Sequence, residues 1–351
     1  MGRAENVAIF EDTRNLCKTD PELVAAIRES NQLQEVILET DSIEKPAPRY
    51  EEPAKIIVSK KRSFEAAQDY PIYKTCVLNF ASATNPGGGV AWGSTAQEEC
   101  LCRCSTLYAN LTEQRLWLPF YEAHRAQNNP LYNDDCIYTP DVIVFKTDTR
   151  EPELMHMEDW WWVNVITCAA PNLRPSRDGR VRVRISNDAL FNLHVKRMRR
   201  ILNIAASREN KVVILGAYGC GAFQNPPGVV ASAMKKVVEE YRYHFRYIEF
   251  AVYCSPRDEQ NYQVTYVQGF KYYTVKAGVY VDDPGKNTEL EKDDRFVSID
   301  GISVSTMSDI KSILAEHEVG DTIKATVART ENGREYHTEV TLTCYEYVPA
   351  S

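Results

Sequence analysis

Apolar residues in the first 265 positions form short compact runs, separated by segments with helical spacing. Compact apolar runs are typical of buried strands, whereas apolar residues three and four positions apart indicate helices. The expected strands are residues 55–59, 76–81, 141–145, 161–167, 211–216 and 247–253. The expected helices lie within residues 1–45, after Ser94, at 190–207 and at 229–243. Strands that alternate with helices predict a layered α/β fold with a largely parallel central sheet.

The chain also divides along its length. In the N-terminal helical segment, Asp20 precedes Pro21, an order that is favoured where an N-cap is followed by the first helical position. After about residue 265 the pattern becomes β-rich, with short strands expected at 278–281, 295–301, 321–327 and 336–343 and a helix at 307–317. We therefore expect two domains: residues 1–265, of which 1–60 form an N-terminal helical extension, and residues 266–351.

Charge and hydropathy restrict the partners. The formal net charge of −8 argues against general binding of nucleic acid, because phosphate backbones attract basic surfaces. Residues 195–200 form a basic cluster, but their spacing fits the solvated face of a helix. No stretch is long and apolar enough to cross a bilayer, so we expect no membrane partner.

The ten cysteines are irregularly spaced, and residues 1–19 have acidic side chains instead of a secretory leader. We therefore expect reduced thiols and a cytoplasmic protein, or a nuclear one in a eukaryote. Cys100, Cys102 and Cys104 lack the paired spacing and histidine partners of zinc sites, and small buried helix residues are expected there. The six histidines show no ligand spacing either. We expect no metal and no cofactor.

The strongest candidate for chemistry joins Gly87-Gly88-Gly89 to Gln97-Glu98-Glu99 across a seven-residue spacer. Glycines let the backbone approach a bulky ligand closely. Ser94 and Gln97 have the spacing of a capping box, which places both glutamates near the start of a helix. An isolated acidic pair would merely decorate a helix start, but three glycines beside it favour a site. Paired carboxylates can transfer protons during cleavage of a glycosidic bond.

A second glycine-rich segment, residues 216–227, follows a strand and precedes a helix. In that context a loop can wrap a phosphate or diphosphate, although a tight strand-to-helix connection is the alternative. Ligands bind at the carboxyl ends of strands in such sheets, so two such loops point to one site. The small residues and proline at 168–172 suggest a loop rim beside a flat ligand, with a plain loop as the default interpretation. The acidic, aromatic segment 132–135 is interpreted as a surface turn or a pocket wall.

Together these residues resemble the signature of poly(ADP-ribose) glycohydrolases. The triple glycine and Gln97-Glu98-Glu99, flanked by Asn79-Phe80-Ala81, are similar to the microbial-type branch, as are the segments 139–142, 170–172 and 219–223. The resemblance covers about residues 1–265. It implies a macrodomain-like three-layer α/β/α fold with a mixed central sheet. It also implies poly(ADP-ribose), or an ADP-ribosylated protein, as the partner.

The resemblance also implies roles for individual residues. Glu99 would donate a proton to the leaving ribose oxygen and then activate water, while Glu98 would hold ribose hydroxyls. The remaining ADP-ribose-binding residues would be Asn79, Phe80, Gly87, Gly88, Gly89, Gln97, Gly219, Cys220, Gly221, Ala222 and Phe223. Both glycine-rich loops would bind the diphosphate through backbone N–H groups, without a metal. Phe223 would pack over the ribose.

The C-terminal part resembles a PDZ domain of the bacterial protease-associated kind, through residues 278–281, 293–301 and 320–323. Such domains capture extended peptide ends by strand addition. The Gly-Asp expected before the third strand is Asp293-Asp294 here, and Gly269-Phe270 is the candidate carboxylate-binding loop. A peptide partner and a packing role against the catalytic domain are therefore both open.

The leading hypothesis is hydrolysis of the ribose–ribose O-glycosidic bond of poly(ADP-ribose), which releases ADP-ribose. Two alternatives remain: hydrolysis of a mono-ADP-ribosyl group on protein or nucleic acid, and a non-catalytic ADP-ribose reader. The intact Gln97-Glu98-Glu99 favours catalysis over reading.

Overall fold

The computed structural model describes residues 2–175, 183–254, 260–265, 281, 287, 289–292, 294–304, 307–331 and 334–345. The chain divides into two compact units, Met1–Val275 and Lys276–Ser351. This division lies ten residues beyond the boundary that the change of sequence pattern predicts at 265.

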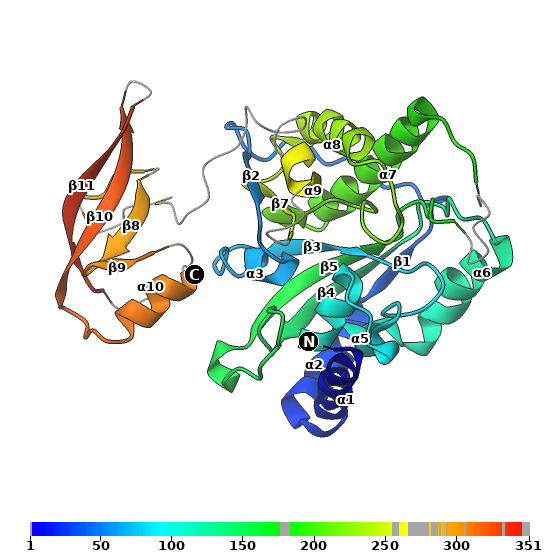
Figure 1. The fold of residues 1–351 in the computed structure, drawn as a ribbon, viewed down its shortest axis with the longest axis horizontal. Helices are drawn as coiled ribbons and strands as arrows, with labels where there is room; N and C mark the ends of the chain where they lie inside the picture. The colour runs from blue at the N-terminus through cyan, green and yellow to red at the C-terminus, as the bar shows by residue number, and fades with distance from the viewer. Residues whose placement is uncertain are drawn as a thin grey trace. The chain divides into compact units, whose positions relative to one another are not determined.

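A seven-stranded mixed sheet forms the centre of the first unit (Figure 1). Its strands are β1 (Glu35–Ile37), β2 (Lys55–Ser59), β3 (Thr75–Phe80), β4 (Cys136–Val144), β5 (Trp161–Cys168), β6 (Val212–Leu215) and β7 (Tyr247–Ala251), in the order β1-β4-β5-β3-β6-β7-β2. The strands from β5 to β2 in this order are parallel, whereas β4 and β1 pair antiparallel at the other edge. The layered α/β fold is confirmed, with β3 and β6 as direct parallel neighbours.

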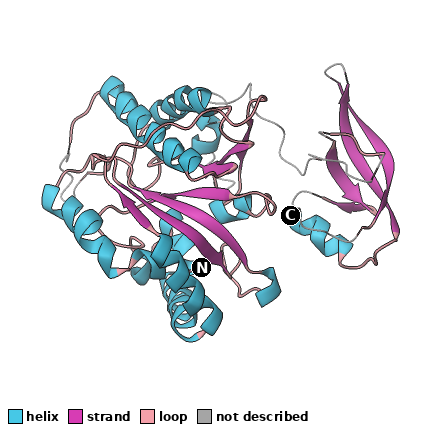
Figure 2. Cartoon of the chain, turned by 180° about the vertical axis from the view of Figure 1, so that it is seen from behind, coloured by secondary structure: helices cyan, strands magenta, loops and turns pink. Residues whose placement is uncertain are grey.

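Helices cover both faces of this sheet (Figures 1 and 2). On one face, α7 (Asn187–Ser207) and α8 (Pro227–Tyr241) share a core with the strands. On the other face the core is completed by α1 (Arg3–Thr19), α3 (Ser63–Ala67), α4 (Gln97–Cys104) and α5 (Leu107–Leu111), while α2 (Pro21–Leu33) packs on β4. The shorter elements are η1 (Val90–Trp92), η2 (Gln114–Leu116), the π-helical turn η3 (Trp117–Glu122), α6 (Ala123–Gln127), η4 (Met157–Asp159) and α9 (Gln260–Val264). No described helix combines the length and apolar character needed to span a membrane.

Side chains alternate between the two faces of the sheet along β3, and this alternation determines which groups lie on each face at the end of the strand. Leu78 belongs to the core under α7 and α8, and Val77 belongs to the core on the opposite face. Because successive strand residues point to opposite faces, Asn79 faces the α4 side and Phe80 packs toward the α7 and α8 side. One strand end therefore supplies a polar group to one face and an aromatic wall to the other.

The N-terminal region is only partly helical. Asp20 caps α2 as expected, because its side chain accepts hydrogen bonds from the backbone N–H groups of Glu22 and Leu23. The expectation of helix up to residue 45 is wrong, since the chain enters β1 directly after α2 and pairs with β4. Edge pairing with β4 satisfies the backbone of β1, and residues 38–54 then carry no helix.

Two surface interpretations are also corrected. In the segment 132–135, interpreted as a surface turn or a pocket wall, Asp134 and Asp135 are nearly inaccessible, which disagrees with a surface turn, and β4 begins directly after them at Cys136. Within the basic cluster expected on a solvated helix face, Arg197 is completely buried. Its guanidinium Nε donates to the Asp134 carboxylate at 2.9 Å. Each of the two charges can be buried because it is paired with the other.

The second unit contains an antiparallel four-stranded sheet in the order β11-β10-β8-β9. Its elements are β8 (Arg295–Ile299), β9 (Ile302–Ser303), α10 (Met307–Leu314), β10 (Thr322–Glu331) and β11 (Arg334–Thr343), which agree with the strands expected at 295–301, 321–327 and 336–343 and with the expected helix. Ile310, Val327 and Leu342 belong to its core. Of the residues that carry the PDZ resemblance, 278–280 and Asp293, and the candidate loop Gly269-Phe270, lie outside the described residues.

Candidate active site

The two glutamates of the signature lie at the first turn of α4, beside the end of β3. The expected capping box is wrong: Ala96 is the N-cap, and no side chain caps the helix. Instead, the Gln97 side chain accepts a hydrogen bond from Phe80 N at 2.8 Å and donates to Leu78 O at 2.8 Å and Ser63 Oγ at 3.0 Å. The amide thus attaches the start of α4 to the end of β3.

Glu98 is buried, with 3% of its surface exposed. Its carboxylate accepts hydrogen bonds from Ser82 N at 2.7 Å and from Asn79 Nδ2 at 3.3 Å. Burial raises the pKa of Glu98 to about 8; the nearby Glu99 raises it as well, while the hydrogen bonds from Ser82 and Asn79 oppose the shift. At neutral pH, Glu98 therefore holds a proton in the folded protein.

Glu99 is oriented differently. One carboxylate oxygen, Oε1, accepts a hydrogen bond from Gly89 N at 2.8 Å. The other, Oε2, is buried and has no hydrogen-bond partner among the described residues. An unpaired buried oxygen is costly, so such atoms often mark a position where a ligand or water binds. Glu99 thus combines a fixed orientation with one free oxygen.

The triple-glycine turn lies against both acids. Gly87 and Gly88 have φ values of 66° and 58°, the left-handed region that glycine tolerates best. A Cβ on Gly88 would lie 2.6 Å from Glu99 Oε1 and 3.0 Å from Glu98 Oε2. The structure thus brings together the two halves of the signature motif, and Gly88 lies between the two carboxylates because it has no side chain.

The second glycine-rich loop, residues 216–227, adjoins this site. β6 is the parallel neighbour of β3, so the loops that follow these two strands lie at the same carboxyl end of the sheet. The rings of Phe80 and Tyr218 lie 5.6 Å apart, edge to face, and a Cβ on Gly216 would lie 2.8 Å from Phe80 Cζ. Farther along the loop, Gly221 and Ala222 are exposed, and a Cβ on Gly221 would meet nothing within 4 Å. The loop therefore offers an open surface beside the end of β3.

Some residues in contact with the site carry no strong sequence signal. Asn225 lies inside the predicted loop motif, but only the structure shows that its side chain connects that loop to residue 171. Tyr121, on the π-helical turn η3, has a buried hydroxyl without a hydrogen-bond partner in the described part of the chain. Its pKa is raised well above the usual value by burial and by the nearby Glu98. Tyr121 lies between Phe120 and Glu122, and nothing in this local sequence singles it out.

Cysteines and histidines do not form a metal site in the described part of the chain, where no group of three or more potential ligands occurs. All ten cysteines are free; Cys102 and Cys104 are buried in α4 as expected, whereas Cys100 is only half-buried.

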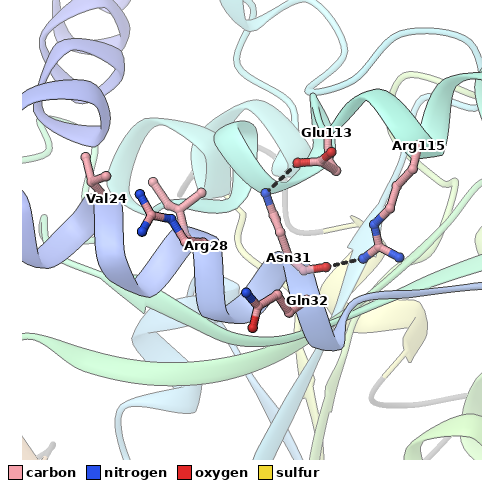
Figure 3. A pocket seen from close by; sticks show the side chains of 7 residues that line it. Val24, Arg28, Asn31, Gln32, Glu113 and Arg115 are labelled. Carbon is pink, nitrogen blue, oxygen red and sulfur yellow. Dashed lines mark hydrogen bonds between the residues drawn. The ribbon is translucent and has the colours of Figure 1, made fainter.

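A separate groove of about 600 Å³ lies between α2 and the segment that follows α5 (Figure 3). Its lining residues are Val24, Ile27, Arg28, Asn31, Gln32, Glu113 and Arg115. Asn31 Nδ2 donates to Glu113 Oε2 at 2.9 Å, and Arg115 donates to the backbone oxygens of Asn31 and Gln34. The groove contains none of the predicted site residues, and Glu113 and Arg115 bind residues at the end of α2.

Glu98 and Glu99 are two buried carboxyl groups beside glycine-rich loops, and paired carboxyl groups are what most glycoside hydrolases use. The family described as microbial-type PARG, catalytic domain, where PARG denotes poly(ADP-ribose) glycohydrolase, matches residues 6–147. A search of curated proteins found no match. Solved structures, in contrast, are similar over most of the chain.

The PARG of Thermomonospora curvata is 26% identical, with a TM-score of 0.65, over 76% of this chain and 100% of that one. A PARG of Deinococcus radiodurans in complex with ADP-ribose is 28% identical, with a TM-score of 0.57, over 69% of this chain and 96% of that one. A variant of the Deinococcus protein, also with ADP-ribose, is 30% identical over 71% of this chain and 91% of that one, with a TM-score of 0.55. The chain belongs to the microbial-type poly(ADP-ribose) glycohydrolases, a family of glycosidases.

Proposed function

We propose that the chain hydrolyses the ribose–ribose O-glycosidic bonds of poly(ADP-ribose) and releases ADP-ribose. The observation that carries this proposal is the Glu99 carboxylate, which is held through Oε1 by Gly89 N and leaves a buried Oε2 without a described partner. Family membership supports the choice of substrate, and two similar Deinococcus structures are complexes with ADP-ribose.

In the proposed mechanism, Glu99 acts as general acid and then as general base. As the bond between the anomeric carbon and the leaving ribose oxygen breaks, Glu99 Oε2 gives its proton to that oxygen, and the anomeric carbon becomes oxocarbenium-like. The resulting Glu99 carboxylate removes a proton from water, whose oxygen bonds to the anomeric carbon. The proton balance closes, because Glu99 ends protonated as it began.

Glu98 would hold the ribose hydroxyls next to Glu99. Because its pKa is raised to about 8, its carboxyl can donate one hydrogen bond as well as accept others at neutral pH. Asn79 Nδ2 donates to Glu98 Oε1 and Thr167 Oγ1, while its buried Oδ1 has no hydrogen-bond partner among the described residues, so Asn79 would orient Glu98 and present Oδ1 to the ligand. Phe80 would form the wall beside the ribose and base.

The diphosphate would bind to backbone N–H groups of the two glycine-rich loops. Gly87, Gly88 and Gly89 would contact it from one side, and residues 219–223 from the other, with Phe223 over the ribose. The exposure of Gly221 and Ala222 supports this assignment, because their backbone is accessible to a ligand. Backbone N–H groups provide the positive dipole ends that a diphosphate needs, so the proposal includes no metal and no cofactor.

The experiment measures three quantities on the purified full chain: release of ADP-ribose from labelled polymer, release from mono-ADP-ribosylated protein, and binding of ADP-ribose. We expect turnover of the polymer. Turnover of the mono-modified protein alone would replace the proposal by the first alternative, and binding without turnover of either would identify a reader.

The Glu99→Gln variant tests the mechanism. Glutamine keeps the shape and the contact with Gly89 N but cannot donate the proton, so we expect kcat to fall about 10²-fold or more while ADP-ribose binding stays within about threefold. A variant that turns over polymer at the wild-type rate would disprove the role of Glu99.

We also propose that the first unit is a macrodomain, that the second is PDZ-like, and that the protein works in the cytoplasm. The three-layer arrangement supports the first assignment, and the antiparallel sheet with α10 supports the second. A peptide partner would add a strand to an edge of the second sheet. Titration with peptides of varied C-terminal sequence tests that partner, and failure of all of them to bind would favour a packing role.

A further inference from the structure

We propose that Asn225 is a positioning residue that holds the second glycine-rich loop in the shape that receives the diphosphate, and that His194 sets the orientation of the Asn225 side chain. The inference rests on the proposed function, because it assigns a ligand to that loop.

The contacts of Asn225 link three segments. The residue is buried, with 1% of its surface exposed. Its amide nitrogen donates to Pro171 O at 2.7 Å and to Gly219 O at 3.0 Å, and its backbone N–H also donates to Gly219 O at 3.0 Å. One side chain thus joins the loop after β6 to the loop after β5.

The third contact fixes which way the amide points. Asn225 Oδ1 lies 2.9 Å from Nε2 of His194, a buried residue of α7. Burial lowers the pKa of His194 to about 4, so the ring is neutral near pH 7 and Nε2–H is the donor that matches an amide oxygen. With its oxygen occupied by this donor, Asn225 can only present Nδ2 to the two carbonyl groups.

Gly219 lies directly against the Asn225 side chain and the loop after β5. Its φ is 78°, and a Cβ at this position would lie 2.7 Å from Asn225 Nδ2 and 2.6 Å from Ala170 Cβ. The glycine, the asparagine and the loop after β5 are therefore in direct contact. A side chain at position 219 would therefore displace Asn225 or the loop after β5, and with them the start of the second glycine-rich loop.

The same helix holds the neighbouring loops. Three residues after His194, Arg197 donates to Ala169 O at 2.8 Å and to Leu131 O at 3.1 Å. Residues at this spacing lie on one face of a helix. One face of α7 thus anchors the loop after β5 directly and the second glycine-rich loop through Asn225.

The geometry points to ligand binding as the role of this anchor, because Asn225 is buried while Gly221 and Ala222, in the loop that it holds, are exposed. Gly221 and Ala222 are exposed and are not packed on a core. Their backbone N–H groups keep one orientation only if the loop ends are fixed. Fixing a binding loop before the ligand arrives reduces the entropy lost on binding, and affinity increases accordingly.

The test compares Asn225→Ala with Asn210→Ala in the full chain. Asn210 is a matched control: it is fully buried, its Nδ2 donates to Ala205 O at 3.0 Å and its Oδ1 accepts from Asn164 at 2.7 Å, but none of these partners belongs to the glycine-rich loops. We expect Asn225→Ala to raise the Kd for ADP-ribose and the KM for polymer about tenfold or more, with kcat changed less than about threefold. Asn210→Ala should leave Kd and KM within about twofold.

A second pair of variants tests the role of His194 and serves equally if Asn225→Ala does not fold. His194→Gln keeps an N–H donor, whereas His194→Phe keeps the ring but removes the donor. We expect ADP-ribose affinity to fall in His194→Phe and to be restored substantially in His194→Gln. Equal affinities in these two variants, or equal effects of the two asparagine substitutions, would overturn the inference. Failure of the wild-type protein to bind ADP-ribose or to turn over polymer would instead refute the proposed function.

Discussion

Gly88→Ala is the substitution for which the structure gives the most direct expectation. A methyl group on this residue would lie 2.6 Å from Glu99 Oε1, whereas ordinary contacts begin at 3.4 Å. The carboxylate would have to retreat by about 0.8 Å, and a misplacement of about 1 Å can cost about 10²-fold in rate. Glu98 Oε2, 3.0 Å from the same point, restricts relaxation on the other side. The φ of 58° adds about 1–2 kcal/mol of backbone strain for alanine.

The assay is kcat on labelled polymer, with the folded state monitored by circular dichroism. We expect a loss of about 10²-fold for Gly88→Ala. Gly301→Ala is the matched control, because Gly301 has a φ of 78° but a Cβ there would meet nothing within 4 Å. It therefore carries comparable strain without touching the carboxylates. If folded Gly88→Ala kept the wild-type kcat, or if Gly301→Ala lost as much, displacement of the acids would not be the cause and the reasoning would fail.

Two further predictions concern buried charges outside the proposed chemistry. Glu249 accepts hydrogen bonds from Ser59 Oγ at 2.5 Å and Tyr70 Oη at 2.6 Å, and burial raises its pKa from 4.5 to about 7. The folded state thus binds a proton that the unfolded chain releases, so the free energy of unfolding should fall as pH rises from about 4.5 to about 7. Urea titrations over this pH range should show a smaller fall in the free energy of unfolding for Glu249→Gln. An unchanged slope would contradict this assignment. Arg197→Ala should lower the free energy of unfolding by about 3–5 kcal/mol, because it leaves Asp134 buried without this partner. Arg199→Ala breaks a more exposed pair with Glu240 and should lower it by about 0–1 kcal/mol in the same titrations. Similar losses in both variants would show that burial does not set the difference.

Local patterns in the sequence were sufficient to predict most elements of the sheet. The apolar runs that predicted β3 and β6 are compact because these strands are covered on both faces, a situation that produces nearly continuous hydrophobic segments. The positions of Glu98 and Glu99 at a helix start followed from sequence neighbours alone. Their proximity to Gly87–Gly89 followed from the shortness of the connection.

The expectations that failed involved partners far away in the sequence. Ser94 and Gln97 have the spacing of a capping box, yet Gln97 bonds to Phe80 and Leu78, which tertiary packing brings to the same side chain. The basic cluster at 195–200 was expected to be solvated, because a pattern of charged residues does not show how deeply each residue is buried. Arg197 is buried because Asp134, 63 positions earlier, lies opposite it.

The sequence by itself thus determined most of the strands, the glycine-rich turns and the pair of acids, since each depends on residues only a few positions apart. Only the tertiary structure decided which Glu99 oxygen is left unpaired, why Glu98 keeps its proton, and how Asn225 joins two loops to α7. These properties depend on burial and on contacts such as that between Asn225 and His194, which are 31 positions apart. The energy of a buried polar group is set by its surroundings, and those exist only once the chain has folded.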